Sequence, residues 1–309
     1  MASITRRQFL KFGATLAAVM GLEPSLAPSL AQALARMEAG QAPVLWLQGQ
    51  SCSGCSVSFL NSEAPSPARV ITRYISLLFH STLSAATGQT AMDTVDKAID
   101  AGGYLLVVEG SLPAGMPEAC VMGHRPVTDL VKAAAAKAKA VVALGSCAAF
   151  GGIPAAQNNP TGAVGVAEFL EAQGVKTPLI NLPGCPTHPD WLVGTLAHLL
   201  QWGLPPLDAL KRPKAFYGRI LHDQCPRFAD YERENFAKTF GEPGCLFKLG
   251  CLGPITHADC TVRFWNGGVN TCIAAGAPCI GCASEGFARS AELPFYRKTE
   301  LARGKGGRN

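Results

Sequence analysis

The stretch that decides the fold is PVLWLQGQSCSGC, at residues 43–55. It opens with a continuous apolar run over residues 44–47 and ends in a turn that contains Gly49, Cys52 and Cys55. A short apolar run without polar alternation is typical of a strand buried on both faces, as in parallel sheets. The sequence therefore predicts a central strand that is followed directly by two cysteines.

The same pattern recurs along the first two thirds of the chain. Apolar runs at residues 104–108, 140–144 and 179–182 are predicted to be further buried strands. Helices are predicted between and after them, at residues 161–173 with Thr161 as the cap and at residues 189–201 with Pro189 in the first turn. Because strands alternate with helices, we predict an α/β fold for residues 36–205, a flavodoxin-like, doubly wound parallel sheet.

Residues 206–296 have a different character. Gly, Pro and Cys interrupt the chain every few residues, and only residues 230–238 show a helical pattern. A segment this irregular cannot bury enough apolar surface to offset its ordering entropy unaided. We therefore predict an irregular C-terminal domain that metal clusters hold together.

The two ends of the chain account for its net positive charge. Residues 1–35 contain Arg6 and Arg7 ahead of an apolar run at residues 12–22, which predicts a twin-arginine (Tat) signal peptide and export to the periplasm of an already folded protein. Residues 297–309 form a basic tail. Of the net charge of +5, these two segments supply +6, so the body is nearly neutral.

Composition narrows the function classes. A neutral body has no basic stripe, which argues against a nucleic-acid partner. After the signal, no run of apolar residues is long enough for a transmembrane helix. Only 16% of the 309 residues are charged, so we expect a partner subunit to cover much of the surface.

The chain has 12 cysteines, and four of them follow predicted strands: Cys52, Cys55, Cys147 and Cys185. The carboxyl ends of parallel strands share one edge of the sheet, where ligands bind. Four thiolates that converge there suit a 4Fe-4S cluster or a tetrahedral zinc ion. A single C-x-x-C could also be a redox dithiol, but four cysteines at strand ends favour a metal site.

The irregular segment holds two more groups of candidate ligands. The first combines one histidine with three cysteines: His222, Cys225, Cys245 and Cys251. The second supplies three or four thiolates: Cys260, Cys272, Cys279 and Cys282. Cys120 is left over and is interpreted as an ordinary buried thiol. Three closed zinc sites would leave no open position for chemistry, whereas a row of iron-sulfur clusters moves electrons.

The residues match a known family at several motifs. These are WLQGQ (46–50) before the C-x-x-C, VEGS (108–111), GSCAAFGG (145–152), PGCP (183–186) with PDW (189–191), and WNGG (265–268). Together they resemble the small subunit of periplasmic nickel-iron hydrogenases, and the presence of Cys272 makes the nickel-iron-selenium subgroup the closest in motif.

The resemblance implies three clusters that relay electrons between a hydrogen-splitting site in a separate large subunit and an external carrier such as a multihaem cytochrome c. The proximal 4Fe-4S cluster would be held by Cys52, Cys55, Cys147 and Cys185. The distal 4Fe-4S cluster would be held by His222, Cys225, Cys245 and Cys251. The medial cluster would be held by Cys260, Cys279 and Cys282; with Cys272 as a fourth ligand it is predicted to be 4Fe-4S, and otherwise 3Fe-4S.

Some positions depart from the family pattern or leave a role open. Ser51 stands where many relatives have Glu, and Gly54 and Gly152 stand where oxygen-tolerant relatives have additional cysteines, so we expect an ordinary proximal cluster. Glu109, at a predicted strand end, is either a group that supports the proximal ligands or a solvated or capping carboxylate. Two other functions stay open at this point: an exported binding protein with its cysteines in disulfides, and a stand-alone iron-sulfur electron carrier.

Overall fold

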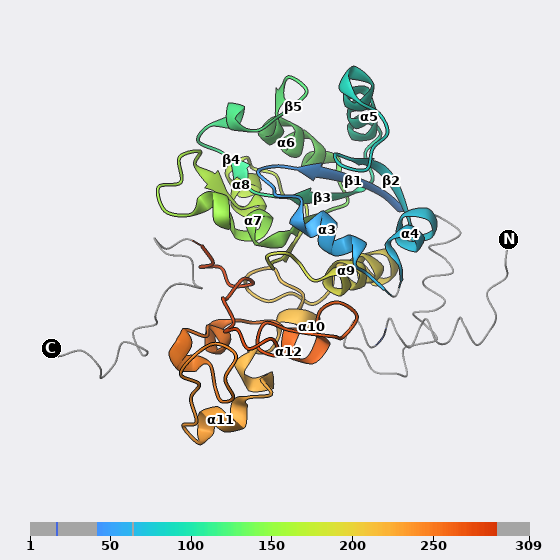
Figure 1. Cartoon of the computed structure of the whole chain (residues 1–309). Helices are drawn as coiled ribbons and strands as arrows, with labels where there is room; N and C mark the ends of the chain where they lie inside the picture. The colour runs from blue at the N-terminus through green and yellow to red at the C-terminus, as the bar shows by residue number, and fades with distance from the viewer. Residues whose placement is uncertain (1–16, 18–41, 64, 289–309) are drawn as a thin grey trace, which may run out of the picture.

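The computed structural model describes residue 17 and residues 42–288 except residue 64 (Figure 1). Its centre is a five-stranded sheet in the order β2-β1-β3-β7-β9, in which all neighbours are parallel. The strands are β1 (Ala42–Gln48), β2 (Ile75–His80), β3 (Leu105–Glu109), β7 (Ala140–Leu144) and β9 (Leu179–Leu182). Counted along the chain this order is 2-1-3-4-5, which is that of a flavodoxin-like sheet, so the predicted fold class is confirmed.

Strand β2 was missed in the sequence. Its residues, ISLLFH, follow directly on a π-helical turn, Val70–Tyr74, and half of them are only partly buried because β2 is an edge strand. Its pairing with β1 also shifts register between Val44 and Leu45. A short apolar run without clear alternation cannot be told from a helix segment by periodicity.

Helices cover both faces of the sheet. On one face lie α3 (Gly54–Leu60) and α9 (Pro189–Trp202); on the other lie α5 (Gly88–Ala101), α6 (Val127–Lys137) and α8 (Val166–Ala172). Successive residues of β1 serve the two cores in turn: Val44 and Trp46 belong to the first, Leu45 and Leu47 to the second. This two-sided burial explains why the strands are continuously apolar.

The helix predictions had mixed outcomes. The helix expected at 189–201 is α9, with Pro189 at its first position and the His188 ring accepting a hydrogen bond from the Asp190 amide. The helix expected at 161–173 is shorter. Its first residues instead form β8 (Ala163–Val164), antiparallel to β4 (Leu112–Pro113), and the Thr161 hydroxyl bonds the Gln50 side chain, so Thr161 is not the cap.

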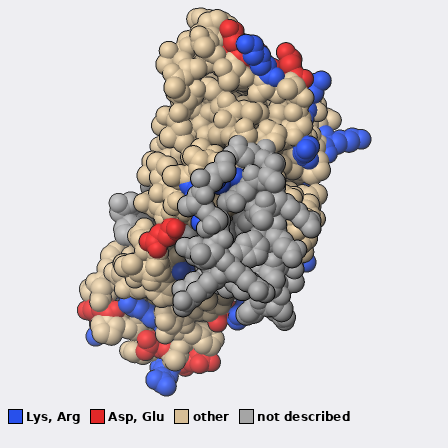
Figure 2. Space-filling view, turned by 90° about the vertical axis from the view of Figure 1, so that its right-hand side faces the viewer, with Lys and Arg blue, Asp and Glu red and all other residues tan. Residues whose placement is uncertain are grey.

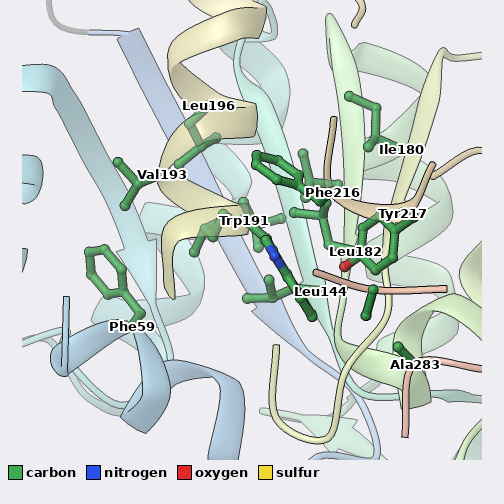
Figure 3. Packing of buried hydrophobic residues seen from close by; sticks show 14 of the residues in the cluster. Phe59, Leu144, Ile180, Leu182, Trp191, Val193, Leu196, Phe216, Tyr217 and Ala283 are labelled. Atoms are coloured by element: carbon green, nitrogen blue, oxygen red, sulfur yellow. The ribbon is translucent and has the colours of Figure 1, made fainter. Parts of the chain in front are cut away.

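Residues 206–288 contain only short helices: α10 (Lys214–Tyr217), α11 (Phe228–Glu232) and α12 (Cys260–Arg263). The helix predicted at 230–238 is thus largely wrong, because the chain turns at Glu234, where φ is 56°. The irregular segment shares the core of the first sheet face. Phe216, Tyr217 and Ala283 pack around Trp191 of α9 (Figure 3), and the Trp191 and Tyr217 rings lie 5.0 Å apart.

Figure 2 shows charged side chains of both signs mainly at the upper and lower ends of the described surface on this face. Among the described helices, none has the length and apolar character to cross a membrane. Apart from Ala17, the predicted signal peptide lies outside the described residues, as does the basic tail at 297–309.

Candidate functional site

The structure brings the first four cysteines together at the carboxyl edge of the sheet. Cys52 and Cys55 follow β1, Cys147 lies in α7 (Gly145–Phe150) directly after β7, and Cys185 follows β9. Their thiols are close enough to affect one another's ionisation. Burial raises the pKa of Cys147 to about 11, and the neighbouring Cys185 and Cys52 act in the same direction. The three loops form one site, although β3 lies between β1 and β7.

Glycine lets the backbone approach these thiols. Gly145 has a φ of 91°, and a Cβ placed there would lie 2.6 Å from Sγ of Cys55. Gly152 has a φ of 52°, and its Cβ would lie 2.8 Å from Sγ of Cys147. Both the backbone angles and the lack of space require glycine. These contacts account for part of the glycine content that surrounds the cysteines in the sequence.

Glu109 supports the first group of cysteines. It ends β3, is only 2% exposed, and accepts hydrogen bonds at one carboxylate oxygen from the amide of Cys55 (3.1 Å), the amide of Ser56 (3.3 Å) and the hydroxyl of Ser51 (3.1 Å). Its other oxygen accepts from the Trp46 indole (3.3 Å). The structure therefore decides the role that the sequence left open: Glu109 is a buried acceptor that orients the cysteine loop.

Ser56 and His80 continue the hydrogen-bond network from Glu109. The Ser56 hydroxyl donates to Glu109 and lies 3.1 Å from Nε2 of His80, at the end of β2. The Thr82 amide donates to Nδ1 of His80, so Nδ1 is unprotonated and Nε2 carries the ring proton. Burial lowers the pKa of His80, which favours this neutral form. Sequence reasoning missed His80 because it missed β2.

The second predicted group also assembles. His222, Cys225, Cys245 and Cys251 line one small cavity. The His222 ring is held between aromatic side chains of α11, with ring centres 4.6 Å from Tyr231 and 5.1 Å from Phe228. Its Nε2 is buried and has no hydrogen-bond partner among the described residues. A buried imidazole nitrogen without a partner is costly, so this ring has an unused capacity to bind a ligand.

The third predicted group lines a second, larger cavity of about 390 Å³: Cys260, Cys272, Cys279 and Cys282. Cys185 of the first group also lines it. Cys272 is the exposed member, whereas Cys279 is buried and its thiol donates to the Thr256 hydroxyl over 3.7 Å. Cys272 thus lines the same cavity as the three thiols that the resemblance supplied.

The remaining cysteine lies apart. Cys120 follows a 3-10 turn, is half-buried, and packs against the core of the second sheet face. Burial raises the pKa of its thiol. Cys120 therefore lies outside the three ligand groups, as expected of an ordinary thiol, but it is less buried than predicted.

The donor chemistry fits iron-sulfur clusters. Burial raises the pKa of Cys55 to about 12 and that of Cys282 to about 11, so a thiolate at either position needs a nearby positive charge, which bound iron supplies. All 12 cysteines are free thiols. Within the described part of the chain, no three His, Cys, Asp or Glu side chains converge on a point that could hold one metal ion.

Comparisons with known families point the same way. A family model for the C-terminal part of the NiFe/NiFeSe hydrogenase small subunit matches residues 217–296, and one described as NADH ubiquinone oxidoreductase, 20 Kd subunit, matches residues 52–199. The chain is 40% identical to the periplasmic [NiFeSe] hydrogenase small subunit of Desulfomicrobium baculatum, over 95% of this chain and 99% of that protein. It is 41% identical to the periplasmic [NiFe] hydrogenase small subunit of Solidesulfovibrio fructosivorans, over 96% of this chain and 93% of the relative.

Solved structures agree. The [NiFeSe] hydrogenase of Desulfomicrobium baculatum superposes with a TM-score of 0.79 at 40% identity, covering 84% of this chain and 99% of that one. The recombinant [NiFeSe] hydrogenase of Desulfovibrio vulgaris Hildenborough gives a TM-score of 0.78 at 42% identity, covering 81% and 96%.

A flavodoxin-like sheet with four cysteines at its carboxyl edge, continued by an irregular segment rich in cysteine, defines an electron-transfer subunit of the iron-sulfur class. The chain belongs to the family of small subunits of nickel-iron and nickel-iron-selenium hydrogenases. The predicted role as the electron-transfer small subunit of a hydrogenase is confirmed, and the comparisons favour it over a disulfide-stabilised binding protein or a stand-alone carrier.

Proposed function

We propose that the three groups of ligands hold a proximal, a medial and a distal cluster in a row. The proximal site is Cys52, Cys55, Cys147 and Cys185, and the distal site is His222, Cys225, Cys245 and Cys251, each for a 4Fe-4S cluster. The medial site is Cys260, Cys272, Cys279 and Cys282. The observation that carries the assignment is that the distal and medial groups each line one cavity, while Cys185 of the proximal group lines the medial cavity and Sγ of Cys251 accepts a hydrogen bond from the amide of Cys279.

The clusters, when bound, supply one-electron oxidation and reduction at each site. The chain's residues supply the rest. Glu109 orients the proximal loop, the Tyr231 and Phe228 rings fix His222, and mostly apolar side chains surround the medial cavity. Such surroundings tune the potentials of iron-sulfur sites.

The hydrogen chemistry is proposed to take place in a large subunit that binds this chain. Large apolar side chains are exposed near the proximal and medial sites, which suits a covered interface: Val57, Leu60, Val262 and Val269. We also propose periplasmic localisation by the Tat route, a multihaem cytochrome c as a carrier at the distal end, and a division into domains at about residue 205.

Cys272 supports a place in the nickel-iron-selenium subgroup and a medial 4Fe-4S cluster. The relatives alone do not decide the subgroup, because the [NiFeSe] and [NiFe] small subunits are 40% and 41% identical to this chain. A fourth thiolate at Cys272 can hold a fourth iron.

Purification of the chain from its native host tests the proposal. We expect it to copurify with a nickel-containing large subunit, to contain about twelve irons per small subunit, and to show broad visible absorption that bleaches with dithionite. A soluble monomer without iron would overturn the proposal, and iron without a nickel partner would point to a stand-alone carrier.

A further inference from the structure

Ser146 is a buried hydroxyl at the junction of the two parts of the molecule. It lies in α7 between Gly145 and Cys147 and is 2% exposed. Its hydroxyl accepts a hydrogen bond from the amide of Gly184 (2.9 Å) and donates to the carbonyl of Cys282. Its own amide donates to the carbonyl of Gly184 (2.9 Å). Each of these contacts satisfies a backbone group that burial would otherwise leave unpaired.

Ser146 and its two hydrogen-bond partners are each a proposed ligand or the residue next to one. Gly184 precedes Cys185, Ser146 itself precedes Cys147, and Cys282 belongs to the medial group. One side chain thus joins the loops after β7 and β9, which hold half of the proximal ligands, to a medial ligand that is 136 residues away in sequence.

Cys185 and Cys282 meet at this junction. Both line the medial cavity, although Cys185 belongs to the proximal group. The backbone of Cys185 also contacts the Cys282 thiol. These two residues therefore link the proximal and medial sites, beside the Ser146 hydroxyl.

We propose that Ser146 is a positioning residue that sets the electronic contact between the proximal and medial sites. This inference rests on the proposed function. Each transfer moves one electron, oxidising the proximal site and reducing the medial one, and no bond is made or broken. Because electron tunnelling weakens steeply with separation, a hydroxyl that fixes Cys282 against the Cys185 loop controls its rate.

The fold should survive loss of this hydroxyl, because other contacts join the same two segments. The Tyr217 hydroxyl donates to the Pro183 carbonyl (2.7 Å), and Nε2 of His188 lies 2.7 Å from the Phe264 carbonyl. Neither contact involves a proposed ligand. Ser58 offers a matched control: it is 6% exposed and donates to the Thr187 carbonyl (2.7 Å), within the flavodoxin-like part.

The test compares Ser146→Ala, Ser146→Thr and Ser58→Ala in the complete heterodimer, after iron content has been matched. Three quantities are measured: the magnetic interaction between the reduced proximal cluster and its neighbour by EPR, hydrogen-driven reduction of an artificial acceptor, and H2/D2 exchange. For Ser146→Ala we expect a weaker magnetic interaction and a several-fold slower acceptor reduction, with exchange retained. Ser146→Thr, which keeps the hydroxyl, should restore both, and Ser58→Ala should change neither.

An unchanged magnetic interaction and rate in Ser146→Ala would overturn the inference, as would the same losses in Ser58→Ala. If Ser146→Ala does not assemble, Ser146→Val and Ser146→Thr replace it, because they have equal shape and differ only in the hydroxyl. Identical results for that pair would also overturn it. A wild-type heterodimer without iron-sulfur signals would instead refute the proposed function itself.

Discussion

The backbone amide of Cys279 donates a hydrogen bond to Sγ of Cys251 over 3.4 Å. This bond joins a residue of the medial group to a residue of the distal group. Burial raises the pKa of the Cys251 thiol, and the amides of Gly253 and Cys279 act in the opposite direction. Together with the contact of Cys185 and Cys282, it connects each proposed ligand group to the next.

Loss of His222 should slow electron transfer to the external acceptor without affecting the reaction with hydrogen. His222→Ala removes one of four proposed ligands while leaving the large subunit untouched. We expect a large fall in hydrogen-driven reduction of a cytochrome acceptor, with H2/D2 exchange retained. His198→Ala, on a half-buried histidine of α9 outside the three groups, is the control. Equal loss of both activities in His222→Ala would contradict the distal assignment.

The type of the medial cluster depends on Cys272. In Cys272→Pro we expect the oxidised protein to gain the sharp signal of a 3Fe-4S cluster, with iron content falling by about one per chain. EPR of the oxidised protein and iron analysis measure both effects. Cys120→Ala, which removes a thiol outside the three groups, should change neither. A 3Fe-4S signal already present in the wild type at one spin per chain would exclude the fourth ligand.

Removal of the Glu109 carboxylate should destabilise the proximal loop. Glu109→Ala leaves the buried amides of Cys55 and Ser56 and the Trp46 indole without their acceptor. Each buried group left unpaired costs about 1–3 kcal/mol, so we expect a lower unfolding midpoint and partial loss of proximal iron. Thermal unfolding and iron content measure these effects. The exposed Glu118 gives the control, Glu118→Ala, and equal behaviour of the two variants would refute the role of Glu109.

A methyl group at Gly145 should displace a ligand. Gly145→Ala combines a φ of 91° with a Cβ that would lie 2.6 Å from Sγ of Cys55. The backbone angle alone costs roughly 1–2 kcal/mol for a non-glycine residue. Gly203→Ala isolates that cost, since Gly203 has a φ of 79° and no atom within 4 Å of its Cβ position. We expect both variants to lose stability but only Gly145→Ala to lose proximal iron, as measured by unfolding and by EPR.

Local sequence patterns were enough to predict much of the fold and the candidate ligands. The central strands are buried on both faces, so their apolar runs identify them without knowledge of the neighbouring strands. Helix α9 carries its own start signal in Pro189. The ligand groups could be proposed because strand ends and short cysteine spacings are local features. Strand β2 and helix α8 were misjudged, because an edge position and a strand pairing between Val164 and Leu112 depend on distant residues.

The sequence by itself determined the fold class, the set of candidate ligands and the family. Only the tertiary structure decided what surrounds them. Glu109 becomes a buried acceptor because β3 places it beside a loop 54 residues earlier, and Ser146 reaches Cys282 because two distant segments share one core. Burial and hydrogen-bond partners are properties of the packed chain, and no local pattern specifies a contact between residues that far apart in sequence.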